Sequence, residues 1–156
     1  SKVLVSFQAI DKNKLKEIEI KKEDIKFSYR GTNLSDDLII ISAKLKGLIS
    51  KKSIVEKKQL NFIETKKLSQ PSQIKTCGST FKNISKDLKA WMLIKKAGCD
   101  QFEEGDATIS QKHCNFFVNK GNAKSSDIEK LIKKVKKKVF EESGINLELE
   151  IKIVGE

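Results

Sequence analysis

The stretch CGSTFKN, residues 77–83, places a serine directly after a glycine and shortly before a lysine and an asparagine. Gly78 gives the backbone unusual freedom at this point. The stretch is too polar for a buried strand, and Phe81 is too apolar for an ordinary surface turn. Taken alone, Ser79 is most simply a turn or capping residue, because serine is common at such places. In the second interpretation, a loop presents the serine hydroxyl to a bound molecule. The local sequence does not fully distinguish the two interpretations, so the other motifs of the chain are needed.

The hydrophobic pattern around this stretch predicts a mixture of strands and helices. Strands are expected over 2–10, 15–20, 38–45, 107–110, 114–119 and 147–153, the run at 38–45 being buried and the first two forming a hairpin. Helices are expected over 53–67, 85–97 and 126–142, and residues 22–37 are expected to be irregular. With no internal repeat, this order of elements predicts the α+β fold class.

Helix ends and a domain boundary follow from local signals. Capping boxes are expected at Ser53–Glu56 and Ser126–Glu129, and terminal glycines at Gly98 and Gly144. The only proline, Pro71, lies in a polar stretch that favours a boundary between two domains, 1–67 and 68–156.

The net charge of +11 suggests an anionic partner, but the composition argues against a nucleic-acid reader. Arg30 is the only arginine among 32 basic residues, and such readers rely on arginine for bidentate contacts. We therefore interpret the lysine excess as compositional bias, and the lysine face of the helix at 126–142 as a solvated surface. A basic α+β module for RNA or another polyanion stays the alternative, although the chain has no recognised RNA motif and no aromatic stacking strand.

The cysteines, together with the absence of apolar runs, narrow the class of protein further. Three cysteines without CxxC spacing argue against a metal site and favour a reduced, cytoplasmic protein. No run approaches the roughly 18 apolar residues of a membrane helix, and there is no signal-peptide pattern. Because the first residue is not Met, the sequence suggests part of a longer chain.

Four stretches in order resemble one enzyme family. They are FSYR at 27–30, CGSTFKN at 77–83, ISQKHCNFFVNKGNA at 109–123 and LELEIKIVG at 147–155. Together they resemble the shorter type of the UDP-N-acetylenolpyruvoylglucosamine reductases, also called UDP-N-acetylmuramate dehydrogenases. Ile84 replaces the proline and Thr32 the serine that are usual in this family. The glycine-rich flavin segments of the family's N-terminal half are missing from this chain.

The resemblance implies a fold and a reaction. It implies the end of a PCMH-type FAD-binding α+β domain followed by a small α+β substrate-binding domain. In the family, a hydride passes from NADPH to FAD and then to C3 of the enolpyruvyl group of the UDP-linked amino sugar. This step belongs to peptidoglycan precursor synthesis in the cytoplasm. The resemblance implies a monomer without a nucleic-acid or membrane partner, and an isolated fragment that is inactive.

The resemblance also assigns residues. It implies catalytic roles for Arg30, Ser79 and Glu150, substrate-binding roles for Tyr29, Lys67 and Asn83, and no metal. Arg30 suits the stabilisation of negative charge, because a guanidinium gives a carboxylate two parallel donors and stays protonated. Ser79 matches the family's donor of a proton to C2. Glu150 alone would be a solvated residue of an alternating strand, and His113 is expected to be structural.

Overall fold

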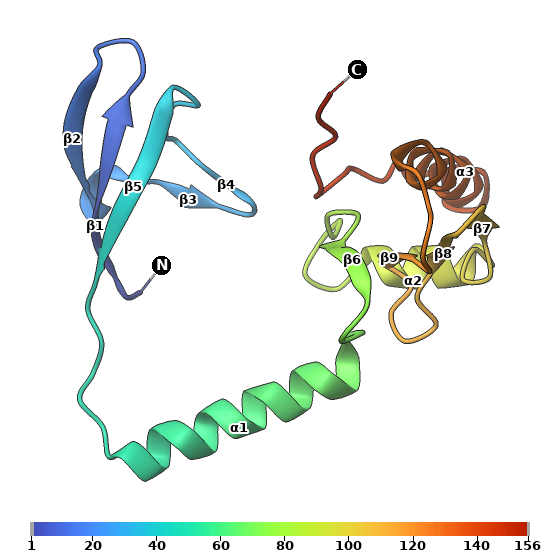
Figure 1. Cartoon of the computed structure of the whole chain (residues 1–156), viewed down its shortest axis with the longest axis horizontal. Coiled ribbons are helices and arrows are strands. Elements are labelled where there is room, and N and C mark those ends of the chain that lie inside the picture. The colour runs from blue at the N-terminus through green and yellow to red at the C-terminus, as the bar shows by residue number, and fades with distance from the viewer. Residues whose placement is uncertain (1, 156) are drawn as a thin grey trace. The chain divides into compact units, whose positions relative to one another are not determined.

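The computed structural model describes residues 2–155 of the 156-residue chain and confirms the α+β class (Figure 1). The chain divides into two compact units, Ser1–Val55 and Glu56–Glu156. Each unit has its own antiparallel sheet, and the two are described separately below.

The first unit is built on a three-stranded antiparallel sheet of order β2-β1-β5. Strand β1 (Leu4–Asp11) pairs with β2 (Lys16–Lys21) across a short polar turn, which confirms the predicted hairpin. On its other edge β1 pairs with β5 (Leu38–Leu45).

Strand β5 has the predicted position but not the predicted burial. Ile39, Ile40 and Ile41 are 53%, 53% and 52% exposed, so the expectation of a buried strand is wrong for this chain. The described residues of the first unit bury only Leu4, Ser6, Ala9 and Ile25, and none of the residues assigned to β5 is buried. The sheet therefore leaves a set of large apolar side chains exposed to solvent.

The segment between β2 and β5 is more regular than predicted. It contains a 3-10 turn (η1, Lys22–Asp24) and a small hairpin of β3 (Phe27–Ser28) and β4 (Gly31–Thr32). The side chain of Asn33 closes the base of this hairpin: its Oδ1 accepts the Lys26 N–H at 2.7 Å and its Nδ2 donates to the Asp24 carbonyl at 3.1 Å. These bonds order a polar segment that has no apolar periodicity to reveal it.

Helix α1 (Lys52–Ser69) confirms the helix expected over 53–67. It begins at Lys52, so Ser53 lies inside the first turn and not at the capping position that was expected. None of its described residues is buried, which agrees with its sparse apolar positions. In the part of the chain that the structure describes, no helix is long and apolar enough to cross a bilayer.

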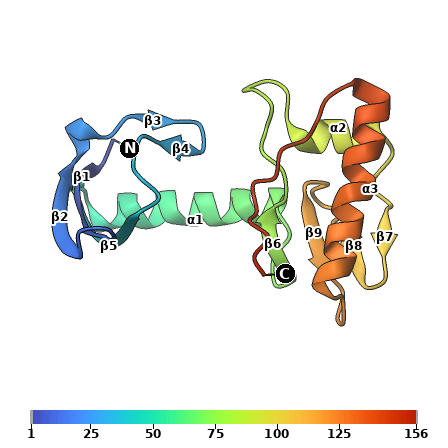
Figure 2. The ribbon, with the colours of Figure 1, turned by 90° about the horizontal axis from the view of Figure 1, so that it is seen from above.

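The second unit holds a four-stranded antiparallel sheet of order β6-β9-β8-β7. Its strands are β6 (Lys75–Ser79), β7 (Glu103–Glu104), β8 (Ala107–Ile109) and β9 (Phe116–Asn119). The last two confirm the strands predicted at 107–110 and 114–119. Helix α3 (Ser125–Ser143) packs against β7 and β8 and against helix α2 (Ala90–Lys96) (Figure 2).

The core of this unit lies between α3 and the sheet. Leu131, Val135 and Val139 of α3 are fully buried, in one cluster with Phe81 and Ile109. This is the apolar helix face that the sequence predicts for 126–142. The packing fixes the sheet, and with it the loop that follows β6.

Two helix starts differ from prediction because side chains bond the backbone in unpredicted ways. Asp127 Oδ2 accepts the Lys124 N–H at 2.9 Å, so the first turn of α3 is closed by Asp127 and not by the expected Ser126–Glu129 box. Helix α2 begins at Ala90 and not at residue 85, because Ser85 Oγ accepts the amide of Leu88 at 2.9 Å and holds a turn there. The glycines end both helices as predicted, with φ of +67° at Gly98 and +69° at Gly144.

The segment 147–153 does not form the predicted strand. It makes a single antiparallel bridge, between Phe81 and Leu149. Leu147 is buried, and Leu149 and Ile151 pack against the core, so the alternation holds for these three positions. Ile153 is 53% exposed.

Candidate functional site

Strand β6 reaches Ser79, its last residue, through a conformation at Gly78 that only glycine adopts easily. Gly78 has φ of +88°, in the left-handed region, and a Cβ at this position would meet no atom within 4 Å. The glycine is therefore required by the backbone turn and not by close packing within the chain. Ser79 itself is half-buried and pairs with Phe116 of β9 across a register shift.

Phe81 anchors the loop that follows Ser79. Its side chain is completely buried, and its ring meets the edge of Phe117 with centroids 5.8 Å apart. Full burial of a phenylalanine stabilises a fold by about 1.5–3 kcal/mol. The loop between Ser79 and Asn83 is therefore attached to the core at its centre.

Glu150 lies next to this loop. Its backbone N–H donates to the Thr80 carbonyl at 2.9 Å, and the Lys82 N–H donates to the Glu148 carbonyl at 2.8 Å, on either side of the bridge between Phe81 and Leu149. The structure thus brings Ser79 and Glu150 onto two adjacent, hydrogen-bonded segments although 71 positions separate them in the sequence. The half-buried Glu150 is more enclosed than the solvated residue that its alternating segment would predict.

Two polar residues complete this part of the site. Asn83 Oδ1 accepts the N–H of Ala90 at 3.2 Å, which ties the end of the loop to the start of α2. Lys82 Nζ lies 3.3 Å from Glu148 Oε2, an exposed ion pair beside the Thr80–Glu150 contact. Ser79, Asn83 and Glu150 therefore gather around one loop of the second unit.

The other predicted residues lie elsewhere along the chain. Tyr29 and Arg30 form the two-residue tip of the β3–β4 hairpin in the first unit, both exposed, with Arg30 Cζ 5.5 Å from the centre of the Tyr29 ring. Arg30 has φ of +58°, a left-handed conformation that is uncommon for a residue with a side chain. Such strained positions often occur at functional sites.

Lys67 is an exposed residue near the end of α1. Its carbonyl accepts a hydrogen bond from Lys112 Nζ, which connects α1 to the turn before β9 within the second unit. Lys67 therefore lies on α1 and not on the segments that carry Ser79, Asn83 and Glu150.

His113, predicted to be structural, holds the turn between β8 and β9. Its Nδ1 accepts the N–H of Asn115 at 3.3 Å, and its ring packs against Phe116 at 4.8 Å and Trp91 at 6.4 Å between centroids. Burial lowers the pKa of His113 below its ordinary value, because the charged ring would be desolvated.

This gives a prediction for the pH dependence of stability. The folded state binds a proton on His113 less readily than the unfolded state, so the free energy of unfolding should fall as the pH drops through and below about 6.5. His113 is the only histidine in the chain, so His113→Gln should remove this slope. Urea unfolding between pH 7.5 and 5.5 measures it. An equal slope in the variant would show that another group is responsible.

The three cysteines are free thiols. Cys99 is buried, and desolvation raises its pKa to about 11, while burial also raises the pKa of Cys114. Cys77 is exposed. Within residues 2–155 no group of three His, Cys, Asp or Glu side chains is arranged to hold a metal ion.

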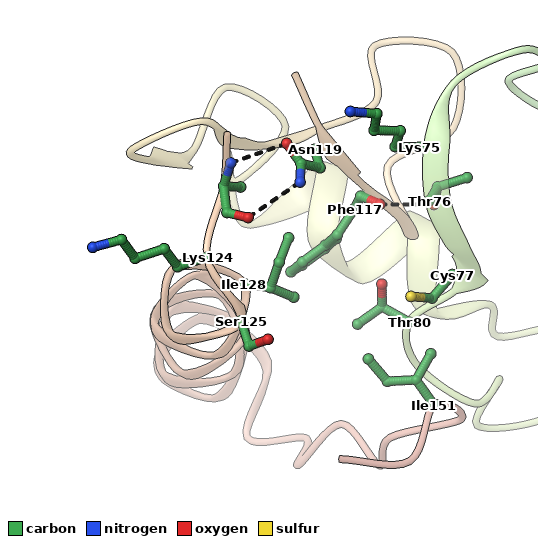
Figure 3. Close-up of a pocket in the computed structure, with 11 residues that line it drawn as sticks. Lys75, Thr76, Cys77, Thr80, Phe117, Asn119, Lys124, Ser125, Ile128 and Ile151 are labelled. Carbon is green, nitrogen blue, oxygen red and sulfur yellow. Dashed lines mark hydrogen bonds between the residues drawn. The ribbon is translucent and has the colours of Figure 1, made fainter. Parts of the chain in front are cut away.

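A separate cavity of about 440 Å³ opens beside β6, between β9 and the first turn of α3 (Figure 3). Its walls are mostly apolar, with Phe117, Ile128 and Ile151 among them. The ammonium groups of Lys75 and Lys124 extend away from its centre in Figure 3. None of the six predicted site residues lines it, so we do not assign the cavity to the candidate site.

Comparisons with known proteins agree with this architecture. Residues 70–154 match the family described as UDP-N-acetylenolpyruvoylglucosamine reductase, C-terminal domain. The chain is similar to the UDP-N-acetylenolpyruvoylglucosamine reductases of Pelagibacter ubique (47% identical over 97% of this chain and 51% of the relative) and Orientia tsutsugamushi strain Ikeda (41% identical over 98% and 50%). It is also similar to the crystal structure of the UDP-N-acetylenolpyruvylglucosamine reductase from Thermus caldophilus, with a TM-score of 0.81, 29% identity, and coverage of 96% of this chain and 52% of that one.

These matches confirm the family resemblance that the four sequence stretches suggest. The chain spans about half the length of the curated relatives it matches.

Proposed function

The chain belongs to the family of UDP-N-acetylenolpyruvoylglucosamine reductase C-terminal domains, and on this premise we propose that it binds the UDP-linked substrate and completes its reduction. The complete enzyme would reduce the enolpyruvyl group to give UDP-N-acetylmuramate, using NADPH and FAD, in peptidoglycan precursor synthesis in the cytoplasm. The observation that carries the proposal is the grouping of Ser79, Asn83 and Glu150 around one loop.

The proposed chemistry requires charge stabilisation and proton transfer. Bound flavin would supply a hydride to C3 of the enolpyruvyl group, and the electron pair of the C2–C3 double bond then moves toward C2 and the carboxylate. The Arg30 guanidinium would pair with this carboxylate through two N–H donors. Stabilisation of developing charge is usually the largest catalytic contribution.

Ser79 would then protonate C2 and recover its own proton from solvent. A serine hydroxyl is a weak acid, so it can serve only with a strongly basic carbon held at a fixed distance. The buried Phe81 and the Glu150–Thr80 hydrogen bond support that role, because they restrain the backbone beside Ser79. Glu150 would assist the carboxylate or the proton path.

Tyr29, Lys67 and Asn83 would bind the substrate. An ammonium group such as that of Lys67 suits a diphosphate as a point charge, and the Asn83 amide can donate to a phosphate oxygen. The same proposal places the domain boundary between residues 67 and 68. Residues 1–67 would then be the end of the FAD-binding domain, and residues 68–156 the substrate-binding domain. The proposal includes the monomeric state that the family resemblance implies.

A flavin site would need more residues than the first unit provides. Its sheet leaves Ile39, Ile40 and Ile41 about half exposed, whereas a cofactor domain of this size normally covers such side chains. This exposure, together with relatives of twice the length, supports the proposal that a preceding half of the polypeptide supplies the cover and most of the flavin contacts.

The purified 156-residue chain should therefore be colourless and should not oxidise NADPH. A longer polypeptide that includes the preceding half should be yellow and should oxidise NADPH only when the UDP-linked enolpyruvyl substrate is present. Visible absorbance and the loss of NADPH absorbance measure both properties. Stoichiometric flavin in the 156-residue chain would contradict the proposed division, and a longer protein without substrate-dependent NADPH oxidation would contradict the proposed function.

Polyanion binding receives no specific support from the lysine-rich helix. Lys134 lies over the Phe102 ring at 5.1 Å, and Lys138 pairs with Glu142 at 3.0 Å. These lysines have intramolecular partners on a solvated helix face.

A further inference from the structure

Asn115, a residue that the sequence analysis does not single out, is a buried polar residue beside the Ser79 loop. It is only 3% exposed and lies just before β9. Its side chain contacts the backbone of Phe81 twice: Oδ1 accepts the Phe81 N–H at 2.9 Å, and Nδ2 donates to the Phe81 carbonyl at 2.8 Å. Its own carbonyl accepts the Thr80 N–H at 2.8 Å.

These three bonds act on the two residues that follow Ser79. The Asn115 amide offers one acceptor and one donor to Phe81, which are the groups a neighbouring β-strand would offer. On its other side Phe81 forms the bridge to Leu149. The backbone of Phe81 is therefore held between Asn115 and the segment that contains Glu150.

Asn115 is itself restrained. Its N–H donates to His113 Nδ1 at 3.3 Å, and the next residue, Phe116, packs its ring against His113. A buried amide whose oxygen and nitrogen both have hydrogen-bond partners keeps one orientation, since any other would leave buried donors or acceptors without partners.

We propose that Asn115 is a positioning residue for proton transfer: it fixes the backbone at Phe81 and thereby the distance between the Ser79 hydroxyl and the substrate. The mechanical part of this proposal stands on the contacts alone. The catalytic part rests on the proposed function, so the two parts are tested separately.

The control comes from the strand that directly follows Asn115. Asn119 is a half-buried asparagine of β9 whose side chain makes three hydrogen bonds to backbone, with Gly121 N–H at 2.8 Å, Ala123 N–H at 3.0 Å and the Ala123 carbonyl at 3.1 Å, whereas the Asn115 side chain makes two. These bonds close the turn after β9 and do not reach the Ser79 loop. Asn119→Leu therefore removes three side-chain hydrogen bonds, one more than Asn115→Leu, without touching Phe81.

The mechanical part is tested by hydrogen exchange of backbone amides in the 156-residue chain. Asn115→Leu should speed exchange by roughly tenfold at Phe81, because the Phe81 amide loses its acceptor. Exchange at Lys82 and Glu150 should rise similarly, because their amides form hydrogen bonds on either side of Phe81. Asn119→Leu should not. Asn115→Asp, which keeps the acceptor for Phe81 N–H and loses the donor, should give an intermediate result and serves if the leucine variant fails to fold. Equal exchange at these amides in the Asn115 and Asn119 variants would overturn the proposal.

The catalytic part is tested in the longer, flavin-containing protein. Asn115→Leu should slow reduction of the substrate by about 10- to 100-fold, the range that a misplaced reacting group can cost, with flavin reduction by NADPH unchanged. In deuterated solvent it should also deliver deuterium to both faces of C2, because water competes with a displaced Ser79. Asn119→Leu should keep the wild-type rate and single-face labelling.

If wild-type protein reduces the substrate and Asn115→Leu behaves like Asn119→Leu, the positioning role is wrong. If wild type does not reduce it at all, the proposed function fails, and the exchange result still decides the mechanical part.

Discussion

Replacing Ser79 by alanine in the complete enzyme should lower turnover by about 10²–10⁴-fold, the usual worth of a positioned general acid. Ser79 is half-buried on a loop whose centre, Phe81, is fully buried, so the substitution should leave the surrounding backbone in place. Substrate should still bind and flavin should still be reduced by NADPH. Steady-state kinetics and a substrate titration measure the two effects.

Two further variants sharpen this prediction. Ser79→Cys should recover part of the rate, because a thiol is a stronger acid than an alcohol and reaches nearly the same point. Ser126→Ala makes the same chemical change at an exposed position of α3 and should be silent. With solvent deuterium, the wild type should label one face of C2 only. If Ser79→Ala keeps the wild-type rate and stereochemistry, Ser79 is simply a turn residue.

Arg30→Lys should be far from conservative, with a loss of about 10²–10³-fold in the step that reduces the substrate. Lysine keeps the positive charge but loses the planar pair of donors that matches a carboxylate. The hairpin should tolerate the change for two reasons. The left-handed conformation at position 30 costs lysine no more than arginine, and position 30 is exposed, so the side chain packs against no core.

The two half-reactions separate this role from a general loss of structure. Stopped-flow traces should show flavin reduction by NADPH close to the wild-type rate and flavin reoxidation by substrate strongly slowed. Arg30→Ala with added guanidinium ion should recover some of the second step. Slowing confined to the NADPH step would contradict the assignment of Arg30 to the substrate carboxylate.

Elements with a complete local pattern were predictable from the sequence. Helix α3 carries its apolar stripe from Ile128 to Val139, about three turns, and the β1–β2 hairpin has alternation on both sides of a polar turn. The α2 start was not predictable, because it depends on Ser85 bonding the amides that follow it. Neither was the exposure of β5, since an apolar run indicates a strand but not which part of a larger protein covers it.

The candidate site was predictable only in part for similar reasons. The motif order indicates Ser79 and Glu150, but their proximity follows from the Phe81–Leu149 bridge, a contact between distant segments. Asn115 lies in the run CNFFVN, where an asparagine among apolar residues is a weak signal of a buried hydrogen-bonded side chain. Its partner, the backbone of Phe81, carries no sequence information at all.

Anaerobic mixing of the NADPH-reduced longer protein with UDP-N-acetylenolpyruvoylglucosamine tests the central claim most directly. The claim is that this chain is the substrate-binding part of a flavin-dependent enolpyruvyl reductase. We predict that the flavin absorbance returns in full with one equivalent of substrate and that UDP-N-acetylmuramate forms in the same amount. Flavin that stays reduced in the presence of excess substrate would contradict the account.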